Sequence, residues 1–157
     1  MKLPDNQMEL KFSKKTQLYS GYVNIKENTL WYWFSRYIRM RDSDEYGMVT
    51  CCTCGKRDYW KTMDCGHYIS RKHKATKYHE LNNHAQCKRC NDKRYGKGEQ
   101  ALYGQFVDKK YGKGSSDTLI ALSKVLKAGV KPFDYKNLSN LYRKKSKELA
   151  KKKGIIL

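Results

Sequence analysis

Apolar side chains recur at three- and four-residue intervals in four stretches of the chain, which is the pattern of an amphipathic helix. The first stretch follows Asn28 or Thr29, either of which is a suitable N-terminal cap, and extends to Arg41. Its stripe is largely aromatic and consists of Leu30, Trp33, Phe34, Tyr37 and Ile38. The polar residues 42–44 break the pattern, so we expect the helix to end there.

Three further helices are expected in the second half of the chain. The first covers residues 99–111, the second follows Ser115 or Ser116, and the third runs from near Asp134 toward Lys153. Glycines follow the first two, as is common at helix C-termini. Their apolar stripes are Leu102, Tyr103, Phe106 and Val107; Leu119, Ile120, Leu122 and Leu126; and Leu138, Leu141, Tyr142 and Leu149.

The chain divides into a polar N-terminal arm and one domain. Residues 1–26 alternate in polarity only around 19–25, so they predict an arm that ends in a short strand. Residues 27–157 fit one domain, because the chain is too short for two ordinary domains. Residues 48–95 form its cysteine-rich centre and residues 98–153 a helical extension. Together they predict an α+β fold.

The charge balance predicts a nucleic-acid partner. Thirty-four Lys and Arg residues against fifteen Asp and Glu residues leave a formal net charge of +19, which favours binding to a polyanion. The thirteen tyrosines and three tryptophans offer rings that can stack on bases, although we expect those of the first helix to be mainly core.

Nothing in the sequence predicts export or membrane insertion. No run approaches the roughly 20 apolar residues of a membrane span, and residues 1–10 lack the pattern of a signal peptide. We therefore expect a cytoplasmic protein without a membrane partner. In that reducing compartment, six cysteines bind metal more readily than they form disulfides.

Four of the cysteines form two Cys-x-x-Cys pairs, Cys51 with Cys54 and Cys87 with Cys90. Four thiolates at this spacing satisfy tetrahedral Zn²⁺ completely, so the predicted zinc site is structural rather than catalytic. Cys52 is left over. Residues 55–86 between the pairs are long enough to insert a hairpin.

The insert carries residues suited to phosphodiester hydrolysis. The reaction needs a base for the attacking water and a divalent cation for the charge that develops on the phosphate. His67 is our candidate base, because a neutral imidazole accepts a proton near physiological pH.

These residues resemble a known nuclease pattern. Asp-x-Gly-His at 64–67, Asn82 and Cys-x-x-Cys-Asn at 87–91 resemble an HNH, or ββα-metal, nuclease with its zinc-binding cysteines. More narrowly, Arg-x-Arg-Asp at 39–42, the motifs at 51–55, 64–71 and 80–91, and the basic C-terminal helix resemble the phage NinG, or Rap, recombination proteins. The similarity covers most of residues 30–150 and is most specific between 51 and 91.

The resemblance implies a zinc-stabilised ββα-metal core, flanked by several helices, in a structure-specific DNA endonuclease. Its implied substrates are Holliday junctions and D-loops in phage recombination, and its implied setting is the cytoplasm of a bacterial host that carries the phage or prophage. Two symmetric cuts in a four-way junction favour a homodimer. The alternatives are a sequence-specific HNH endonuclease and a non-enzymatic zinc module that only binds nucleic acid.

The resemblance also implies roles within the site. Asn82 is expected to position the loop that carries His67, and Asn91 to bind a catalytic Mg²⁺ or Mn²⁺, which prefer oxygen ligands. Gly66 stands where many relatives have a ligand, and Asp64 is the expected substitute because alternate residues of a strand share a side. The alternative for Asp64 is an ion pair with a nearby cation. His84 is a second-rank candidate ligand.

Three basic residues are candidate DNA contacts. Arg71 is expected to bind the scissile phosphate, and Lys93 and Arg94 the neighbouring ones. For each, the alternative is a solvated surface charge.

Overall fold

A computed structural model describes residues 27–92, 94, 99–125, 129–131 and 134–157. The predicted N-terminal arm, its short strand and Lys93 lie outside the described residues. The described part consists of helices and two small two-stranded antiparallel sheets, so the predicted α+β class is confirmed.

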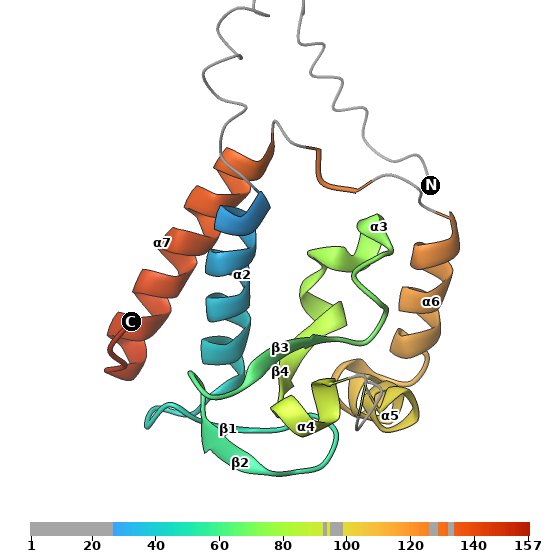
Figure 1. The fold of residues 1–157 in the computed structure, drawn as a ribbon, viewed down its shortest axis with the longest axis horizontal. Coiled ribbons are helices and arrows are strands. Elements are labelled where there is room, and N and C mark those ends of the chain that lie inside the picture. Colours follow the sequence, from blue (N-terminus) through green and yellow to red (C-terminus); the bar gives the residue numbers. More distant parts are fainter. Residues whose placement is uncertain (1–26, 93, 95–98, 126–128, 132–133) are drawn as a thin grey trace, which may run out of the picture.

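Helix α2 (Glu27–Asp42) packs along helix α7 (Tyr135–Lys153), as Figure 1 shows. The predicted stripe is buried, with Leu30, Phe34 and Ile38 fully inaccessible to solvent. Phe34 meets Tyr142 of α7 edge to face, with ring centroids 4.9 Å apart. The pairing of these two helices therefore forms one side of the core.

Both ends of α2 are held by distant residues. The helix begins at Glu27, so the prediction that Asn28 or Thr29 caps it is wrong. The Glu27 carboxylate instead accepts hydrogen bonds from Lys77 Nζ at 2.5 Å and from Tyr78 Oη at 3.0 Å, contacts that no local pattern reveals. At the other end, Lys153 Nζ donates to the carbonyl of Met40 at 2.7 Å, which also accepts a hydrogen bond from Ser43 Oγ at 2.9 Å.

Strands β1 (Met48–Thr50) and β2 (Arg57–Tyr59) pair around the first cysteine pair. In the turn between them, the Cys51 N–H donates to the Lys56 carbonyl at 2.8 Å, and the Gly55 N–H to the Cys51 carbonyl at 3.1 Å. Gly55 has a φ of +75°, which residues with a side chain rarely adopt. The turn thus presents Cys51 and Cys54 on one side.

Strands β3 (Asp64–His67) and β4 (Asn83–Gln86) form the second pair, in which His67 lies opposite Asn83. Residues 68–82 connect them and contain helix α3 (Lys74–Lys77) and the 3₁₀ turn η1 (Glu80–Asn82). Strand β4 leads into helix α4 (Lys88–Asn91). This strand–strand–helix order agrees in outline with the expected ββα centre, while membership of the HNH class stays a prediction.

Helices α5 (Gln100–Tyr111) and α6 (Ser115–Val125) cover the other side of the β3–β4 pair (Figure 1). Tyr103 and Val107 of α5 are fully buried, as the stripe predicted. Leu102 and Leu141, however, are 45% and 44% exposed, so their predicted burial is wrong. Both residues lie next to the buried line of their helix, and each step along a helix rotates the side chain by about 100°.

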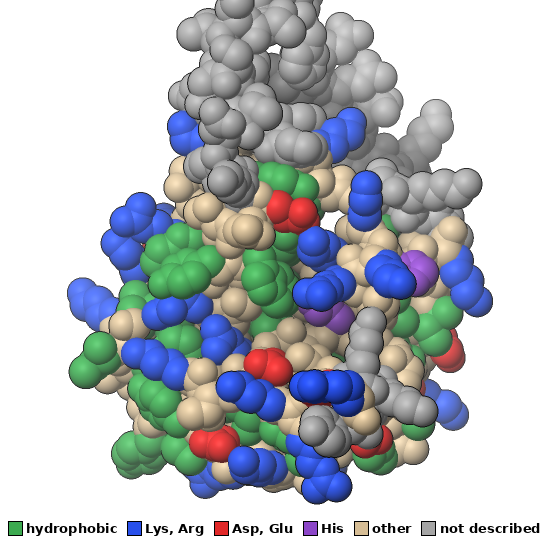
Figure 2. Space-filling view, viewed as in Figure 1, with side chains coloured by type: hydrophobic (Ala, Val, Ile, Leu, Met, Phe, Trp, Pro, Cys, Tyr) green, Lys and Arg blue, Asp and Glu red, His purple; other side chains and the backbone are tan. Residues whose placement is uncertain are grey.

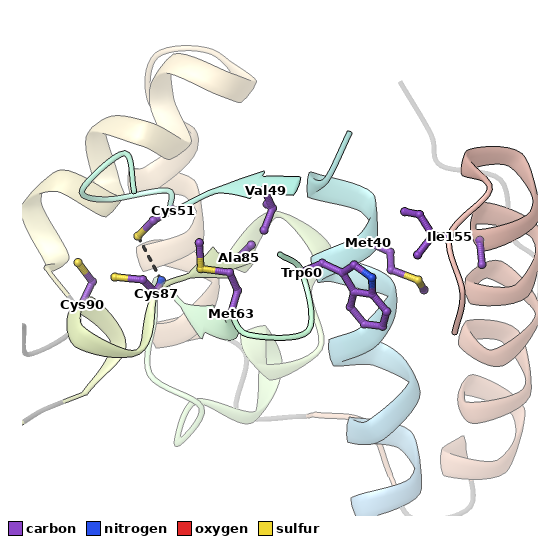
Figure 3. Packing of buried hydrophobic residues seen from close by; sticks show 10 residues of the cluster. Met40, Val49, Cys51, Trp60, Met63, Ala85, Cys87, Cys90 and Ile155 are labelled. Carbon is purple, nitrogen blue, oxygen red and sulfur yellow. Dashed lines mark hydrogen bonds between the residues drawn. The ribbon is translucent and has the colours of Figure 1, made fainter. Parts of the chain in front are cut away.

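One buried cluster joins the cysteines to the helices. Figure 3 shows Cys51, Cys87 and Cys90 at one end of this cluster, with Met63 and Ala85 in its middle and Trp60, Met40 and Ile155 toward α2 and α7. Trp60 and Met40 are fully buried. The cysteine site is therefore continuous with the hydrophobic core.

Candidate active site and metal centre

The four cysteines of the two pairs come together as predicted. The sulfur atoms of Cys51, Cys54, Cys87 and Cys90 all lie within 4.8 Å of one another, and Cys54 Sγ is 3.7 Å from Cys87 Sγ. Tetrahedral Zn²⁺ with Zn–S bonds of about 2.3 Å requires sulfur separations of about 3.8 Å. The cluster can therefore hold a structural metal such as zinc.

The surroundings of the sulfur atoms also suit a metal. The Cys87 N–H donates to Cys51 Sγ at 3.2 Å, drawn as a dashed line in Figure 3. Burial raises the pKa of the Cys51 thiol, but the N–H groups of Cys54 and Cys87 outweigh it and lower this pKa to about 6. Burial raises the pKa of Cys90 to about 12. A bound cation is thus what would keep all four groups as thiolates.

A second group of predicted residues lines one pocket of about 760 Å³. Asp64, His67, Arg71 and Asn91 all contribute to its wall. Asn91 Nδ2, at the end of α4, donates to Asp64 Oδ2, at the start of β3, at 3.1 Å. Asp64 forms no direct ion pair among the described residues, although its charge partly opposes the lowering of the pKa of Arg39 by burial in the same pocket, so both interpretations of this carboxylate stay predictions.

Two neighbours fix the ring of His67. Trp31 stacks on it with ring centroids 5.2 Å apart and an angle of 16° between the planes. His67 Nε2 lies 3.1 Å from the carbonyl oxygen of Lys77, which can only accept a hydrogen bond. The proton of the neutral ring therefore sits on Nε2, and Nδ1 keeps its lone pair. Burial lowers the pKa of His67 to about 4, so the ring is neutral at physiological pH.

Asn82 is fully buried and holds the loop that follows His67. Its Oδ1 accepts from the Ile69 N–H at 2.7 Å, and its Nδ2 donates to the carbonyls of Ile69 at 3.0 Å and Thr76 at 2.9 Å. These bonds tie together both ends of the segment between His67 and Lys77. The geometry is that of a positioning residue, and Asn82 does not line the pocket.

Asn83 is a fully buried residue whose part in the site the sequence reasoning missed. Its Nδ2 donates to the carbonyl of Lys77 at 3.1 Å and to that of His79 at 2.8 Å. The Lys77 carbonyl is also the acceptor for His67. The signal in the sequence was weak, because only the strand register shows that residues 67 and 83 are opposite each other.

Gly66 has a packing reason for the absence of a side chain. A Cβ atom at this position would overlap the side chain of Gln86, with 2.9 Å to Gln86 Cβ. The Gly66 carbonyl accepts from Tyr103 Oη at 2.9 Å, which fixes the strand in place. A metal ligand at position 66 is therefore excluded unless Gln86 moves.

The structure does not bring His84 to Asp64 and Asn91. His84 is fully buried and does not line the pocket. Its Nδ1 lies 3.1 Å from Asp42 Oδ2, and its ring packs against Phe106 at 4.9 Å between centroids. In the register His84 is opposite Gly66, so it points to the other side of the strands from His67. These contacts indicate a structural role.

The remaining candidate contacts differ in their surroundings. Arg71 lines the pocket beside His67 and is exposed. Arg94 is exposed, does not line the pocket and pairs with Asp92 at 2.7 Å. The structure thus groups only Arg71 of the three with the candidate active site, since Lys93 is not described.

The fold and the site together define a basic α+β protein with a four-cysteine cluster that can hold a metal, next to a polar pocket. A protein-family model described as Bacteriophage Lambda NinG protein matches residues 10–152. The match covers most of the chain, so the protein belongs to the NinG family of phage recombination proteins. The resemblance seen in the motifs is thereby confirmed for the family. No curated protein and no solved structure matches the chain.

Among the described residues, no helix is both long and apolar enough to cross a membrane.

Proposed function

We propose that this NinG-family protein is a metal-dependent DNA endonuclease that cleaves branched recombination intermediates, namely Holliday junctions and D-loops. The observation that carries the proposal is the grouping of Asp64, His67 and Asn91 around one pocket. These side chains supply an acidic oxygen, a neutral imidazole and an amide. They can supply a general base and oxygen ligands for a divalent cation, which are the two functions that hydrolysis of a phosphodiester by water needs.

His67 is the proposed general base. Its Nε2–H is held by the Lys77 carbonyl, so Nδ1 is the atom that takes the proton from the attacking water. The Trp31 ring and the Lys77 carbonyl keep the imidazole from turning. Asn82 and Asn83 maintain this arrangement by fixing the loop and the accepting carbonyl.

Asp64 and Asn91 are the proposed ligands of a catalytic Mg²⁺ or Mn²⁺. Their contact uses Asn91 Nδ2 and Asp64 Oδ2, so Asn91 Oδ1 and the other Asp64 oxygen remain as ligand atoms for a metal. Two oxygen ligands suit a hard cation that keeps several of its waters. When bound, the cation neutralises charge on the phosphate and on the departing oxygen. Arg71 is proposed to bind the scissile phosphate from the same pocket.

The surface charge supports DNA as the partner. Lys and Arg side chains greatly outnumber acidic ones on the face seen in Figure 2, in line with the net charge of +19. We further propose that zinc occupies the four-cysteine cluster, that the protein acts as a homodimer, and that it acts in the cytoplasm of the phage host.

A cleavage assay tests it. Purified protein is incubated with a synthetic four-way junction and with a linear duplex of the same sequence, in Mg²⁺, in Mn²⁺ and in a chelator that spares the zinc. We expect metal-dependent cleavage of the junction and little of the duplex. Equal cleavage of both would favour the sequence-specific alternative, and no cleavage by zinc-loaded protein would favour the binding module.

Substitution of the base sharpens the test. His67→Ala is expected to lower the cleavage rate by about 10²- to 10⁴-fold. His73→Ala is the matched control, because His73 is an exposed histidine in the same loop that does not line the pocket. Equal rates for the two variants would remove His67 from the mechanism.

A further inference from the structure

Arg39 reaches the candidate active site from the last turn of α2 and is held there by backbone carbonyls. Its Nε donates to Ser35 O at 3.0 Å, and its Nη1 donates to Trp60 O at 3.3 Å and Met63 O at 3.1 Å. The guanidinium carbon also lies 5.4 Å from the centroid of the Trp60 ring. These contacts fix the position and plane of the guanidinium.

The positive charge of Arg39 is only partly compensated within the protein: burial lowers its pKa and outweighs the charge of Asp64, which raises it. No carboxylate of the described residues forms an ion pair with Arg39, although its side chain is half-buried. Burial lowers the pKa of Arg39, as expected for a cation removed from water without full compensation. A buried charge is normally paired, so the lack of a direct ion pair among these residues calls for an explanation.

Arg41, on the same helix, shows what a structural arginine looks like in this protein. Its Nε donates to Asp42 Oδ1 at 2.9 Å and its Nη2 to Asn83 O at 2.8 Å. Burial lowers the pKa of Arg41, but Asp42 outweighs it and the net shift is upward. Asp42 thus forms a direct ion pair with Arg41, whereas no carboxylate of the described residues does so with Arg39.

Among the described residues, one part of the Arg39 side chain is left without a hydrogen-bond partner, and Arg39 borders the pocket. Arg39 lines it together with Asp64, His67 and Asn91, and its Nη2 makes no hydrogen bond with the described residues. Because Nε and Nη1 of Arg39 already donate hydrogen bonds, its Nη2 group is a preorganised donor for a ligand in the pocket. Anions with oxygen acceptors are the preferred ligands of such a group.

We propose that Arg39 binds a phosphate of the DNA backbone in this pocket and is the counter-ion of that phosphate. The assignment rests on the proposed function for the identity of the substrate, but not for the existence of an anion site. In the cleavage reaction, Arg39 would donate to a non-bridging phosphate oxygen as negative charge grows there. Arg71 would approach from the exposed side.

Cleavage rates of two arginine variants test the role. Removal of one preorganised donor typically lowers the rate by about 10²- to 10³-fold, and we expect this loss for Arg39→Ala and Arg39→Lys. Arg36→Ala is the matched control, because Arg36 is also 5.4 Å from the Trp60 ring and loses the same charge, but does not line the pocket. Equal losses in the Arg36 and Arg39 variants would overturn the proposal.

A measurement on the unsubstituted protein keeps the proposal testable if the Arg39 variants fail to fold. The Nε–Hε signals of arginine side chains are followed by NMR in metal-free buffer with the zinc retained. A short DNA duplex should shift the Arg39 signal, and a duplex with neutral methylphosphonate linkages should not. If the Arg39 signal does not shift when the charged duplex is added, the assignment is overturned. Absence of cleavage would refute the proposed function alone.

Discussion

The substitution Asn82→Ala separates a positioning residue from a ligand, and its effect can be estimated from the structure. The side chain makes three hydrogen bonds in a fully buried site, to the backbone of Ile69 and Thr76. Each lost bond that leaves a buried partner unsatisfied costs about 1 kcal/mol or more. We therefore expect a loss of about 3 kcal/mol in the free energy of unfolding.

The measurement is urea unfolding of zinc-saturated protein, together with the rate of junction cleavage. A loss of about 3 kcal/mol corresponds to a fall in Tm of about 6–12 °C for a domain of this size. Cleavage should fall as well, because the loop that holds the Lys77 carbonyl against His67 loses its anchor.

Asn91→Ala is the comparison. Among the described residues, the side chain of Asn91 makes one half-buried hydrogen bond, to Asp64, so its loss should change the unfolding free energy by less than about 1 kcal/mol. As a proposed metal ligand it should nevertheless lower the cleavage rate at least about 10-fold and weaken activation by Mg²⁺. If Asn82→Ala is as stable as the unsubstituted protein, Asn82 does not hold the loop as the structure indicates. If Asn91→Ala cleaves at the full rate, Asn91 is not a ligand of the catalytic metal.

Three further outcomes are expected. Burial lowers the pKa of His67 from 6.5 to about 4, so its stabilising contribution is complete above pH 6.5 and is lost as the pH falls toward 4. The free energies of unfolding at pH 5 and at pH 7 should therefore differ less in His67→Gln than in the unsubstituted protein. Removal of zinc by a strong chelator, or the substitution Cys90→Ser, should abolish the cooperative thermal transition. The reason is that structural zinc contributes on the order of 10 kcal/mol in small modules. An unchanged transition in calorimetry would exclude a structural metal. Binding to any DNA sequence should weaken with salt at a log–log slope of about −5 to −7 if about five to eight phosphates are contacted, and a flat response in fluorescence anisotropy would contradict the basic-surface argument.

Local patterns were sufficient to predict the four long helices α2, α5, α6 and α7 and the cysteine cluster. The 3.6-residue period of Leu30, Phe34 and Ile38 comes from burial of one helix face, so it predicts α2 directly. The Cys-x-x-Cys spacing similarly reflects the reach of two sulfur atoms to one ion. Both signals depend on residues close together in the chain.

The support of the site could not be predicted in the same way. The contacts that support the site join elements that are far apart in sequence, and they are made by the Lys77 carbonyl, Asn83 and Arg39. A backbone carbonyl carries no sequence signal, and an arginine that lacks a direct ion pair looks like any other until its surroundings are known. The same holds for the start of α2, which Lys77 and Tyr78 stabilise through Glu27.

The four-cysteine cluster and the candidate active site are coupled through adjacent residues. Cys87 follows directly after β4, and Cys90 directly precedes Asn91. Helix α4 has only four residues and is too short to be stable alone, so its direction depends on how Cys87 and Cys90 are held. We therefore expect the hydrogen bond from Asn91 to Asp64 to depend on how the four cysteines hold α4. A metal that takes no part in the chemistry would in this way determine whether the proposed catalytic ligands meet.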